Sequence, residues 1–177
     1  MRSVIIMFIL CMAALAACKN TTTASTAVKF NQQPTLLTTI PAGYEAGEIT
    51  FSDNGLQVAV ILQKEGKMAM SINSEISPMY EGVRSPAFHA TSKQYAFVAS
   101  KDGKQCVVFN GKEGALYDSV RNPYITAEGR IVYAAQRGEK WFIVSGDKVS
   151  QALNTADPSL YVSSDGKRLA FVEQNSA

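Results

Sequence analysis

The side chains that could carry nucleophilic or metal chemistry are few. The 177 residues include three cysteines and a single histidine, His89, so a Ser-His-Asp or Cys-His site would have to use His89. No G-x-S-x-G, H-E-x-x-H, Walker-type or G-x-G-x-x-G motif occurs, and one histidine with so few thiols argues against a zinc site. The sequence therefore predicts no catalytic residue, no metal and no cofactor. Paired carboxylates for glycoside chemistry stay open, since no pair stands out.

The first eighteen residues carry the clearest chemical signal. Arg2 precedes the apolar run Val4–Ala17, which is shorter than the roughly 20 residues of a membrane-spanning helix. A basic start, an apolar centre and a small-residue end are typical of a secretory signal. The final residues, Leu15-Ala16-Ala17-Cys18, resemble the lipobox of bacterial lipoproteins. This resemblance implies that residues 1–17 are a signal peptide, that cleavage falls before Cys18, and that the Cys18 thiol carries the lipid.

The lipoprotein resemblance also implies an address in the cell envelope. Two or three acyl chains on one residue give durable anchoring, so a membrane is an expected partner. Lys19 after the lipidated cysteine favours the outer membrane of a Gram-negative envelope, facing the periplasm or the surface. The alternative is that Ala14-Leu15-Ala16 is an ordinary cleavage site that frees a soluble protein. The polar residues 18–27 are predicted to be a flexible, Ser/Thr-rich tether.

The remaining segment, residues 28–177, has the composition of one folded domain. Hydrophobic residues make up 46% and charged residues 18% of the chain, which excludes a disordered or collagen-like protein. The formal net charge of +2 falls to +1 once Arg2 is removed, so a nucleic-acid partner is not expected. Cys106 would remain as a lone thiol in an apolar run, which predicts a small core residue and no intramolecular disulfide.

An internal repeat of about 37 residues runs through this domain. Gly66-Lys67 returns as Gly103-Lys104 and, with one change, as Gly138-Glu139, at separations of 37 and 35 residues. The longer matches are Tyr80–Pro86 with Tyr117–Pro123, and Phe51–Ala59 with Phe88–Ala96, Val162–Phe171 and a copy near Ile125–Tyr133 that is one residue shorter. Four copies at near-constant spacing predict a repeat architecture.

Each copy is predicted to form four short antiparallel strands. Turn pairs such as Asn54-Gly55 and Asp102-Gly103 suit two-residue hairpins, and about ten residues between turns leave no room for an ordinary helix. The second strand of each copy is apolar at nearly every position: Val58–Leu62, Tyr95–Ala99, Ile131–Ala135 and Leu169–Val172. A sheet with one wet face would alternate, so these strands must be buried on both faces, as in sheets stacked around an axis.

Three segments carry a resemblance to a known repeat: Val162–Phe171, Gly138–Gly146 and Tyr117–Pro123. They resemble the TolB-like, WD-repeat-like β-propeller repeat of bacterial envelope proteins, and the resemblance covers about residues 28–172. It implies an all-β, β-propeller-like fold of about four four-stranded antiparallel blades. The sequence departs from the pattern at Ser92, which replaces a turn glycine, at Gly129, which is slipped by one position, and at Ala152, which replaces a tyrosine.

The ends of the domain fit the same architecture. The last copy stops after two strands, and Val28–Phe51 contains material for the second half of a unit in Val28-Lys29-Phe30, Thr35–Ile40 and Tyr44-Glu45. We therefore expect the two termini to share one blade and close the ring without a long edge strand. An open arc, or two chains joined in a larger ring, are the alternatives, so both monomer and dimer stay open.

Most remaining polar and aromatic side chains are predicted to be structural. His89 takes the repeat position of Ser52 and Ser163, at the end of an inner strand. Turn formation, rather than calcium binding, is predicted for Asp53, Asp102, Asp147 and Asp165. Core packing, rather than sugar stacking, is predicted for Trp141 and Phe142. A solvated rim is predicted for Lys112, Glu113, Lys140 and Lys148. An outer-strand role is predicted for the recurring pairs Tyr44-Glu45, Tyr80-Glu81 and Tyr117-Asp118.

The sequence thus favours a non-enzymatic, lipid-anchored envelope protein. Its propeller-like repeats would act as a scaffold for a protein or envelope-polymer partner, with recognition on the loops of one face. One alternative is a glycan-active hydrolase or lyase that uses His89 or an acid near a central channel. Another is a remnant of a longer propeller protein. No ligand-binding residue is assigned by the sequence.

Overall fold

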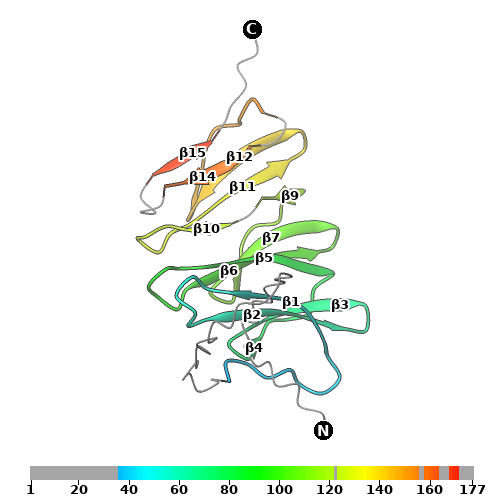
Figure 1. Cartoon of the computed structure of the whole chain (residues 1–177). Coiled ribbons are helices and arrows are strands. Elements are labelled where there is room, and N and C mark those ends of the chain that lie inside the picture. Colours follow the sequence, from blue (N-terminus) through cyan, green and yellow to red (C-terminus); the bar gives the residue numbers. More distant parts are fainter. Residues whose placement is uncertain (1–35, 122, 156–157, 164–167, 172–177) are drawn as a thin grey trace, which may run out of the picture.

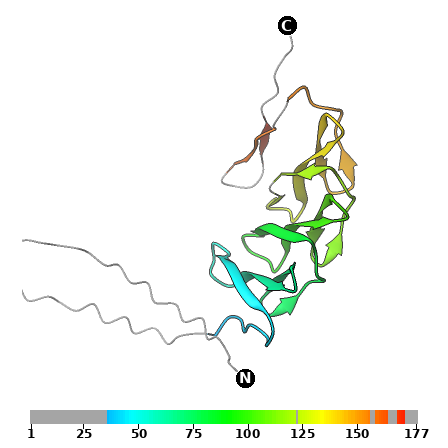
Figure 2. The same cartoon turned by 90° about the vertical axis from the view of Figure 1, so that its right-hand side faces the viewer.

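The computed structural model describes residues 36–121, 123–155, 158–163 and 168–171. Cys18, the predicted signal peptide and the predicted tether therefore lie outside the described residues. Every regular element in the described part is a strand, and no helix there is long and apolar enough to cross a membrane. The strands form antiparallel sheets that stack one after another along an arc (Figure 1 and Figure 2). The predicted all-β, propeller-like fold is confirmed.

Four successive sheets, called blades 1 to 4 below, follow the order of the chain. Blade 1 contains β1 (Glu45–Phe51), β2 (Val58–Lys64), β3 (Lys67–Ile72) and β4 (Glu75–Ile76). Blade 2 contains β5 (Gly82–Phe88), β6 (Tyr95–Lys101), β7 (Lys104–Phe109) and β8 (Lys112–Glu113). Blade 3 contains β9 (Ser119–Val120), β10 (Tyr124–Ile125), β11 (Ile131–Arg137), β12 (Lys140–Ser145) and β13 (Lys148–Val149), with β9 and β10 both paired to β11. Blade 4 contains β14 (Leu160–Val162) and β15 (Leu169–Phe171).

Tight turns with positive φ set the register of the blades. Both residues of Glu65-Gly66 and of Asp102-Gly103 have positive φ, as a two-residue hairpin between right-twisted strands requires. At the next turn, Asn73 Oδ1 accepts the Val58 N–H at 2.9 Å, and Asn110 Oδ1 accepts the Tyr95 N–H at 3.0 Å. The asparagine side chain thereby binds the start of the second strand to the end of the third.

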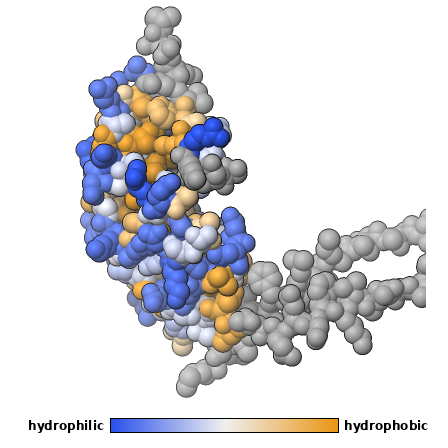
Figure 3. All heavy atoms as spheres, turned by 90° about the vertical axis from the view of Figure 1, so that its left-hand side faces the viewer, coloured by the Kyte–Doolittle hydropathy of each residue, from blue (hydrophilic) through white to orange (hydrophobic). Residues whose placement is uncertain are grey.

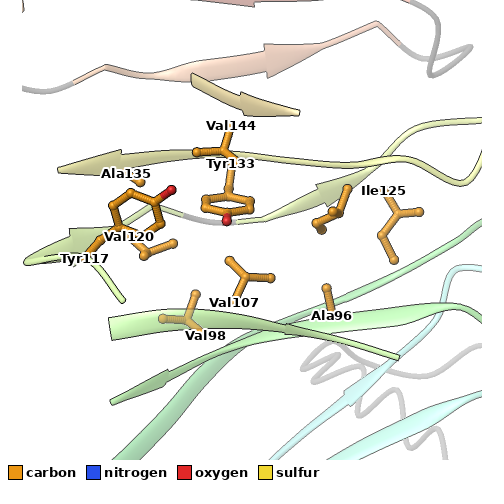
Figure 4. Packing of buried hydrophobic residues seen from close by; sticks show 10 residues of the cluster. Ala96, Val98, Val107, Tyr117, Val120, Ile125, Tyr133, Ala135 and Val144 are labelled. Carbon is orange, nitrogen blue, oxygen red and sulfur yellow. The ribbon is translucent and has the colours of Figure 1, made fainter. Parts of the chain in front are cut away.

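The second strands of blades 1 to 3 are buried on both faces, as predicted. In β6, Ala96 and Val98 pack with blade 3, whereas Phe97 and Ala99 pack with blade 1, and none of the four is more than 1% exposed. Figure 4 shows the first of these contacts, with Tyr133 of β11 directed toward Val107 of β7. Adjacent residues of one strand thus belong to two different cores, because the blades cover the sheet from both sides.

Blade 4 departs from this prediction. Leu169 and Phe171 of β15 are 39% and 41% exposed, and Ala170 is exposed as well. Within the described residues β15 pairs only with β14, and Leu160 of β14 is the side chain that packs against the core of blade 3. Apolar side chains gather over this end of the arc (Figure 3). An apolar strand is therefore buried on both faces only where another part of the chain covers each face.

The segment before blade 1 also differs from its predicted role. Tyr44 and Glu45 were expected to complete the last unit, but Glu45 opens β1 and pairs with Gln63 of β2. Leu37 and Ile40 pack on the face of β2 that is turned away from blade 2, because that apolar face needs a cover. The described residues form an arc rather than a ring (Figure 2). The Val28 side of the expected closure lies outside the described residues.

Candidate functional site

In blade 3, β9 and β10 together take the place that one first strand, β1 or β5, has in blades 1 and 2. The ends of β1, β5 and β10 meet around a cavity of about 350 Å³, called the first-strand cavity below. Its lining comes from the ends of β1, β5 and β10 and from the turns after them: Thr50, Phe51, Ser52, Asp53, Pro86, Ala87, Phe88, His89, Ala90, Tyr124, Ile125 and Ala127. Half-buried aromatic rings form its apolar wall, and exposed turn residues such as Asp53 and Ala90 form its rim. Figure 2 shows β1 on the concave side of the arc.

His89 is 7% exposed in the wall of this cavity, and both of its ring nitrogens are engaged. Nδ1 accepts the backbone N–H groups of Thr91 at 3.2 Å and Ser92 at 3.0 Å. A nitrogen that accepts two hydrogen bonds carries no proton, so the ring proton lies on Nε2. Nε2 then donates to the carbonyl of Ala127, 3.1 Å away in the next blade. His89 holds its own turn and binds blade 2 to blade 3.

The same place in the other blades is filled by hydroxyl residues that close the same turn. Ser52 Oγ accepts the Gln57 N–H at 2.9 Å, and Ser163 Oγ accepts the Arg168 N–H at 2.9 Å. In blade 3, Thr126 Oγ1 accepts the Arg130 N–H at 3.2 Å, across a turn that is one residue shorter. The structural position predicted for His89 and the one-residue deletion in the third copy are both confirmed.

The tyrosine that begins each unit packs against the blade before it. Tyr80 and Tyr117 are buried and form isolated bridges with Met68 and Gln105. The third bridge joins Trp141 to Leu153, so the tyrosine position predicted at Ala152 belongs to Leu153. Tyr44 is half-buried and does not share this position. Glu45 pairs with Gln63, and 37 residues later Gly82 pairs with Ser100, so Glu45 is equivalent to Gly82. Tyr44 is therefore equivalent to Glu81, one residue after the tyrosine position.

The acidic residues after these tyrosines stabilise the central hairpins. Glu81 accepts the backbone N–H groups of Asp102 at 3.0 Å and Gly103 at 3.2 Å. Asp118 accepts the Gly138 N–H at 2.7 Å and binds Lys104 at 2.8 Å. The Lys104 ammonium and the Gly138 N–H lower the pKa of Asp118. These pairs are structural, as their recurrence predicted.

The Glu113 side chain, predicted to lie on a solvated rim, is held by two contacts. Its Oε1 accepts the Tyr80 hydroxyl at 3.0 Å, and its Oε2 lies 3.1 Å from Lys101 Nζ. Both contacts lower the pKa of Glu113, the Lys101 hydrogen bond most strongly, while burial raises the pKa of the Tyr80 hydroxyl. Glu113 therefore binds the Tyr80 segment to blade 2. The other predicted rim residues, Lys112, Lys140 and Lys148, are exposed.

The remaining predicted residues fall into the core or onto turns. Cys106 is fully buried, and burial raises the pKa of its thiol, so its predicted place in the core is confirmed. Trp141 is 3% exposed and packs between blades 3 and 4, and Phe142 is half-buried. The described part of the chain contains no group of three or more His, Cys, Asp or Glu side chains able to hold a metal. Asp165 lies outside the described residues.

Amide side chains that bind neighbouring blades together were missed by the sequence analysis. Gln57 Nε2 donates to the Ser92 carbonyl at 3.1 Å, and Gln94 Nε2 donates to the Gly129 carbonyl at 3.3 Å. Arg84 adds a third link, since it donates to the Val120 carbonyl at 2.6 Å. Gln57 and Gln94 are 37 residues apart. The repeat alignment already contained this signal, but a recurring glutamine does not by itself indicate which blade it contacts.

A second cavity, called the interblade cavity below, has a volume of about 460 Å³ and lies between blades 2 and 3. Its lining contains apolar side chains, charged side chains and several glycines: Val107, Phe109, Lys112, Glu113, Gly114, Glu128, Gly129, Arg130, Ile131, Tyr133, Gly146 and Asp147. No local sequence pattern indicates this cavity, because its residues come from β7, β8, β11 and two turns that are distant in the sequence.

The strand pairing and the stacked blades place the chain in the class of all-β, β-propeller-like proteins. Neither a family model nor a curated relative matches the chain. Among solved structures, the β-propeller domain of the Trilobed protease from Pyrococcus furiosus is similar at 13% identity and a TM-score of 0.45, over 67% of this chain and 45% of that one. The calcium-binding protein regucalcin from Agrobacterium tumefaciens is similar at 14% identity and a TM-score of 0.33, over 80% of this chain and 50% of that one. The chain spans about half the length of these two structures.

Proposed function

We propose that this protein is a lipid-anchored scaffold of the bacterial cell envelope that binds a protein or an envelope polymer in the first-strand cavity. The observation that carries the binding role is the cavity itself, in which the ends of three consecutive blades offer a preformed surface. Cavities of about 300–1,000 Å³ with apolar walls and a few polar groups are typical of ligand sites. The rim comes from turns on rigid sheets, which is where scaffolds usually place recognition.

The hydrogen bonds around the cavity fit a binding role better than a catalytic one. His89 uses both ring nitrogens on backbone groups, so no nitrogen is left to take a proton from a nucleophile. The rim residues Asp53, Ala90 and Ala127 are exposed and accessible to a large partner. Such a surface can hold a partner by shape and polar contacts, and the proposed role therefore requires no turnover.

Membrane attachment is expected to depend on Cys18 alone. Replacement of Cys18 with alanine removes the thiol that would carry the acyl chains, and each buried CH₂ of those chains contributes about 0.8 kcal/mol to membrane binding. In a Gram-negative host we expect the wild-type protein in the membrane fraction, cleaved before residue 18 and lipidated. The Cys18→Ala variant should be neither cleaved at that site nor lipidated. Cys11→Ala is the matched control, because Cys11 precedes the cleavage site. Intact-mass analysis that finds an unmodified Cys18 in the mature wild-type protein would refute the anchor.

Partner contact is expected to concentrate at the first-strand cavity. A photo-cross-linking amino acid at Ala90, which is exposed at the rim, should give a discrete adduct in intact cells. The same group at Gln151, which is exposed outside the cavity, is the control and should give none. Mass spectrometry of the adduct then distinguishes a protein from a glycan polymer. Equal labelling from both positions, or none from Ala90, would contradict the proposed site.

A further inference from the structure

The interblade cavity lies where two side-chain oxygens of the repeat are missing. In blade 1, Ser77 Oγ accepts the Met70 N–H at 3.0 Å and donates to the Pro78 carbonyl at 2.8 Å. In blade 3, Ser150 Oγ accepts the Ile143 N–H at 2.9 Å and donates to the Gln151 carbonyl. The hydroxyl thus bridges two backbone groups at the edge of the third strand in both blades.

Blade 2 has glycine at this position. Gly114 keeps the backbone bond of the series, with its N–H 2.9 Å from the Val107 carbonyl, just as the Ser77 N–H binds the Met70 carbonyl. With no side chain at Gly114, the serine hydroxyl that accepts this N–H in blades 1 and 3 is missing, and no hydrogen bond joins a side chain of the described residues to the Val107 N–H. The nearest hydroxyl belongs to Tyr133, 3.7 Å from the position that a Cβ at Gly114 would take. Val107 and Gly114 both line the interblade cavity.

On the side of blade 3, the same cavity lacks a second side-chain oxygen that the other blades have. The asparagines Asn73 and Asn110 accept the first N–H of the second strand in blades 1 and 2. In blade 3 the equivalent residue is Gly146, whose N–H binds the Ile131 carbonyl as the Asn110 N–H binds the Tyr95 carbonyl. Gly146 therefore offers no amide oxygen to the Ile131 N–H. Ile131 and Gly146 also line the interblade cavity, so both missing acceptors belong to one site.

We propose that the interblade cavity is a saccharide-binding site, in which sugar hydroxyls occupy the places of the two missing oxygens. A hydroxyl accepts and donates at once, so one sugar hydroxyl can take the Val107 N–H and bind the Ala115 carbonyl, as the serines do in blades 1 and 3. A second oxygen takes the Ile131 N–H. Buried polar groups are costly when unpaired, which favours a ligand that supplies these acceptors.

The rest of the cavity matches this class of ligand. Its volume of about 460 Å³ suits a ligand of one to three sugar units. Phe109 provides a half-buried aromatic ring, and Tyr133 closes the floor with its side chain directed toward Val107 (Figure 4). The exposed rim offers donors from Lys112 and Arg130 and a carboxylate acceptor from Asp147. Charges of both signs around an apolar floor fit a neutral, hydroxyl-rich ligand better than an ion.

The test follows two amide signals during a sugar titration. The ¹⁵N-labelled full chain, in a detergent without a sugar headgroup, is titrated with chitotriose, maltotriose and cellotriose up to about 10 mM, a range that detects millimolar affinity. We expect the Val107 and Ile131 signals to shift saturably with at least one of the three. If neither signal moves with any of them, or if an alanine tripeptide moves both and the sugars do not, the saccharide proposal is wrong and the cavity holds water or peptide instead.

Substitution at Gly114 separates this site from the rest of the protein. Gly114→Ser restores the hydroxyl of blades 1 and 3, and we expect at least a tenfold loss of sugar affinity. Its Cβ would lie 3.1 Å from the Val107 carbonyl oxygen, so the backbone must shift slightly, and the unfolding midpoint is measured alongside to show that the variant folds. Ser150→Gly is the matched control, because it removes the same hydroxyl outside the cavity and should leave affinity unchanged. If Gly114→Ser fails to fold, Arg130→Ala at the exposed rim should still lower affinity. Undiminished affinity in folded Gly114→Ser or in Arg130→Ala would overturn the proposal, whatever is found for Cys18 or the first-strand cavity.

Discussion

Phe97→Ala is expected to lower the free energy of unfolding by about 3–5 kcal/mol. Phe97 is 1% exposed in β6, on the face that packs against blade 1, and its ring meets Tyr80 edge to face at 6.3 Å between centroids. Its removal leaves a cavity between two blades that are rigid sheets and cannot close the gap. Against a total of about 5–15 kcal/mol for an ordinary domain, a large part of the stability is lost. Urea unfolding followed by tryptophan fluorescence measures the change.

Phe171→Ala is the matched control, because Phe171 occupies the same place in β15 that Phe97 occupies in β6. Phe171 is 41% exposed, so we expect its replacement to cost about 1 kcal/mol or less. A loss at Phe171 as large as at Phe97 would show that a further part of the chain covers β15. A small loss at both positions would mean that blade 1 does not pack against β6.

The fold was predictable from the sequence because the repeat shows in both spacing and polarity. The hairpin turns need positive φ at fixed intervals, so Asp102-Gly103 marks a turn without any tertiary information. The apolar second strands carry the blade packing, since burial on both faces removes the alternation of an ordinary strand. The prediction failed at Leu169–Phe171, where the strand is as apolar as its counterparts but pairs, within the described residues, only with β14 and has exposed side chains. An apolar sequence shows that both faces of a strand can be buried, whereas the exposure of its side chains depends on whether other parts of the chain cover those faces.

The candidate sites were much less predictable, for a physical reason. A repeat pattern shows which residues recur, and it correctly gave His89 a structural place. The interblade cavity arises from residues that are missing from the pattern, since Gly114 and Gly146 stand where the other blades have a serine or an asparagine. A glycine in a β-rich sequence is usually taken as a turn residue. Only the hydrogen bonds of Ser77 and Asn110 in the sister blades reveal what the two glycines leave out.

Ala96→Asp is expected to prevent folding at neutral pH. Ala96 is fully buried in β6 on the face toward blade 3, surrounded by Val107, Ile125 and Tyr133. An ionised carboxylate without a partner costs several kcal/mol in such a place, and the extra volume adds to this. Burial raises the pKa of the introduced carboxyl above its unfolded value of about 3.9. The charge penalty is therefore smallest below about pH 4 and grows as the pH rises toward the folded-state pKa.

Ala170→Asp is the matched control, because Ala170 is the exposed counterpart of Ala96 in blade 4. We expect its free energy of unfolding at pH 7 to lie within about 0.5 kcal/mol of the wild-type value. Far-ultraviolet circular dichroism at pH 7 and pH 4 compares the two variants. Together with Phe97→Ala, this pair tests the two faces of β6 separately, because Phe97 faces blade 1 and Ala96 faces blade 3. If Ala96→Asp folds normally, blade 3 does not cover β6, and neither the stacked blades nor the two cavities between them can exist as described.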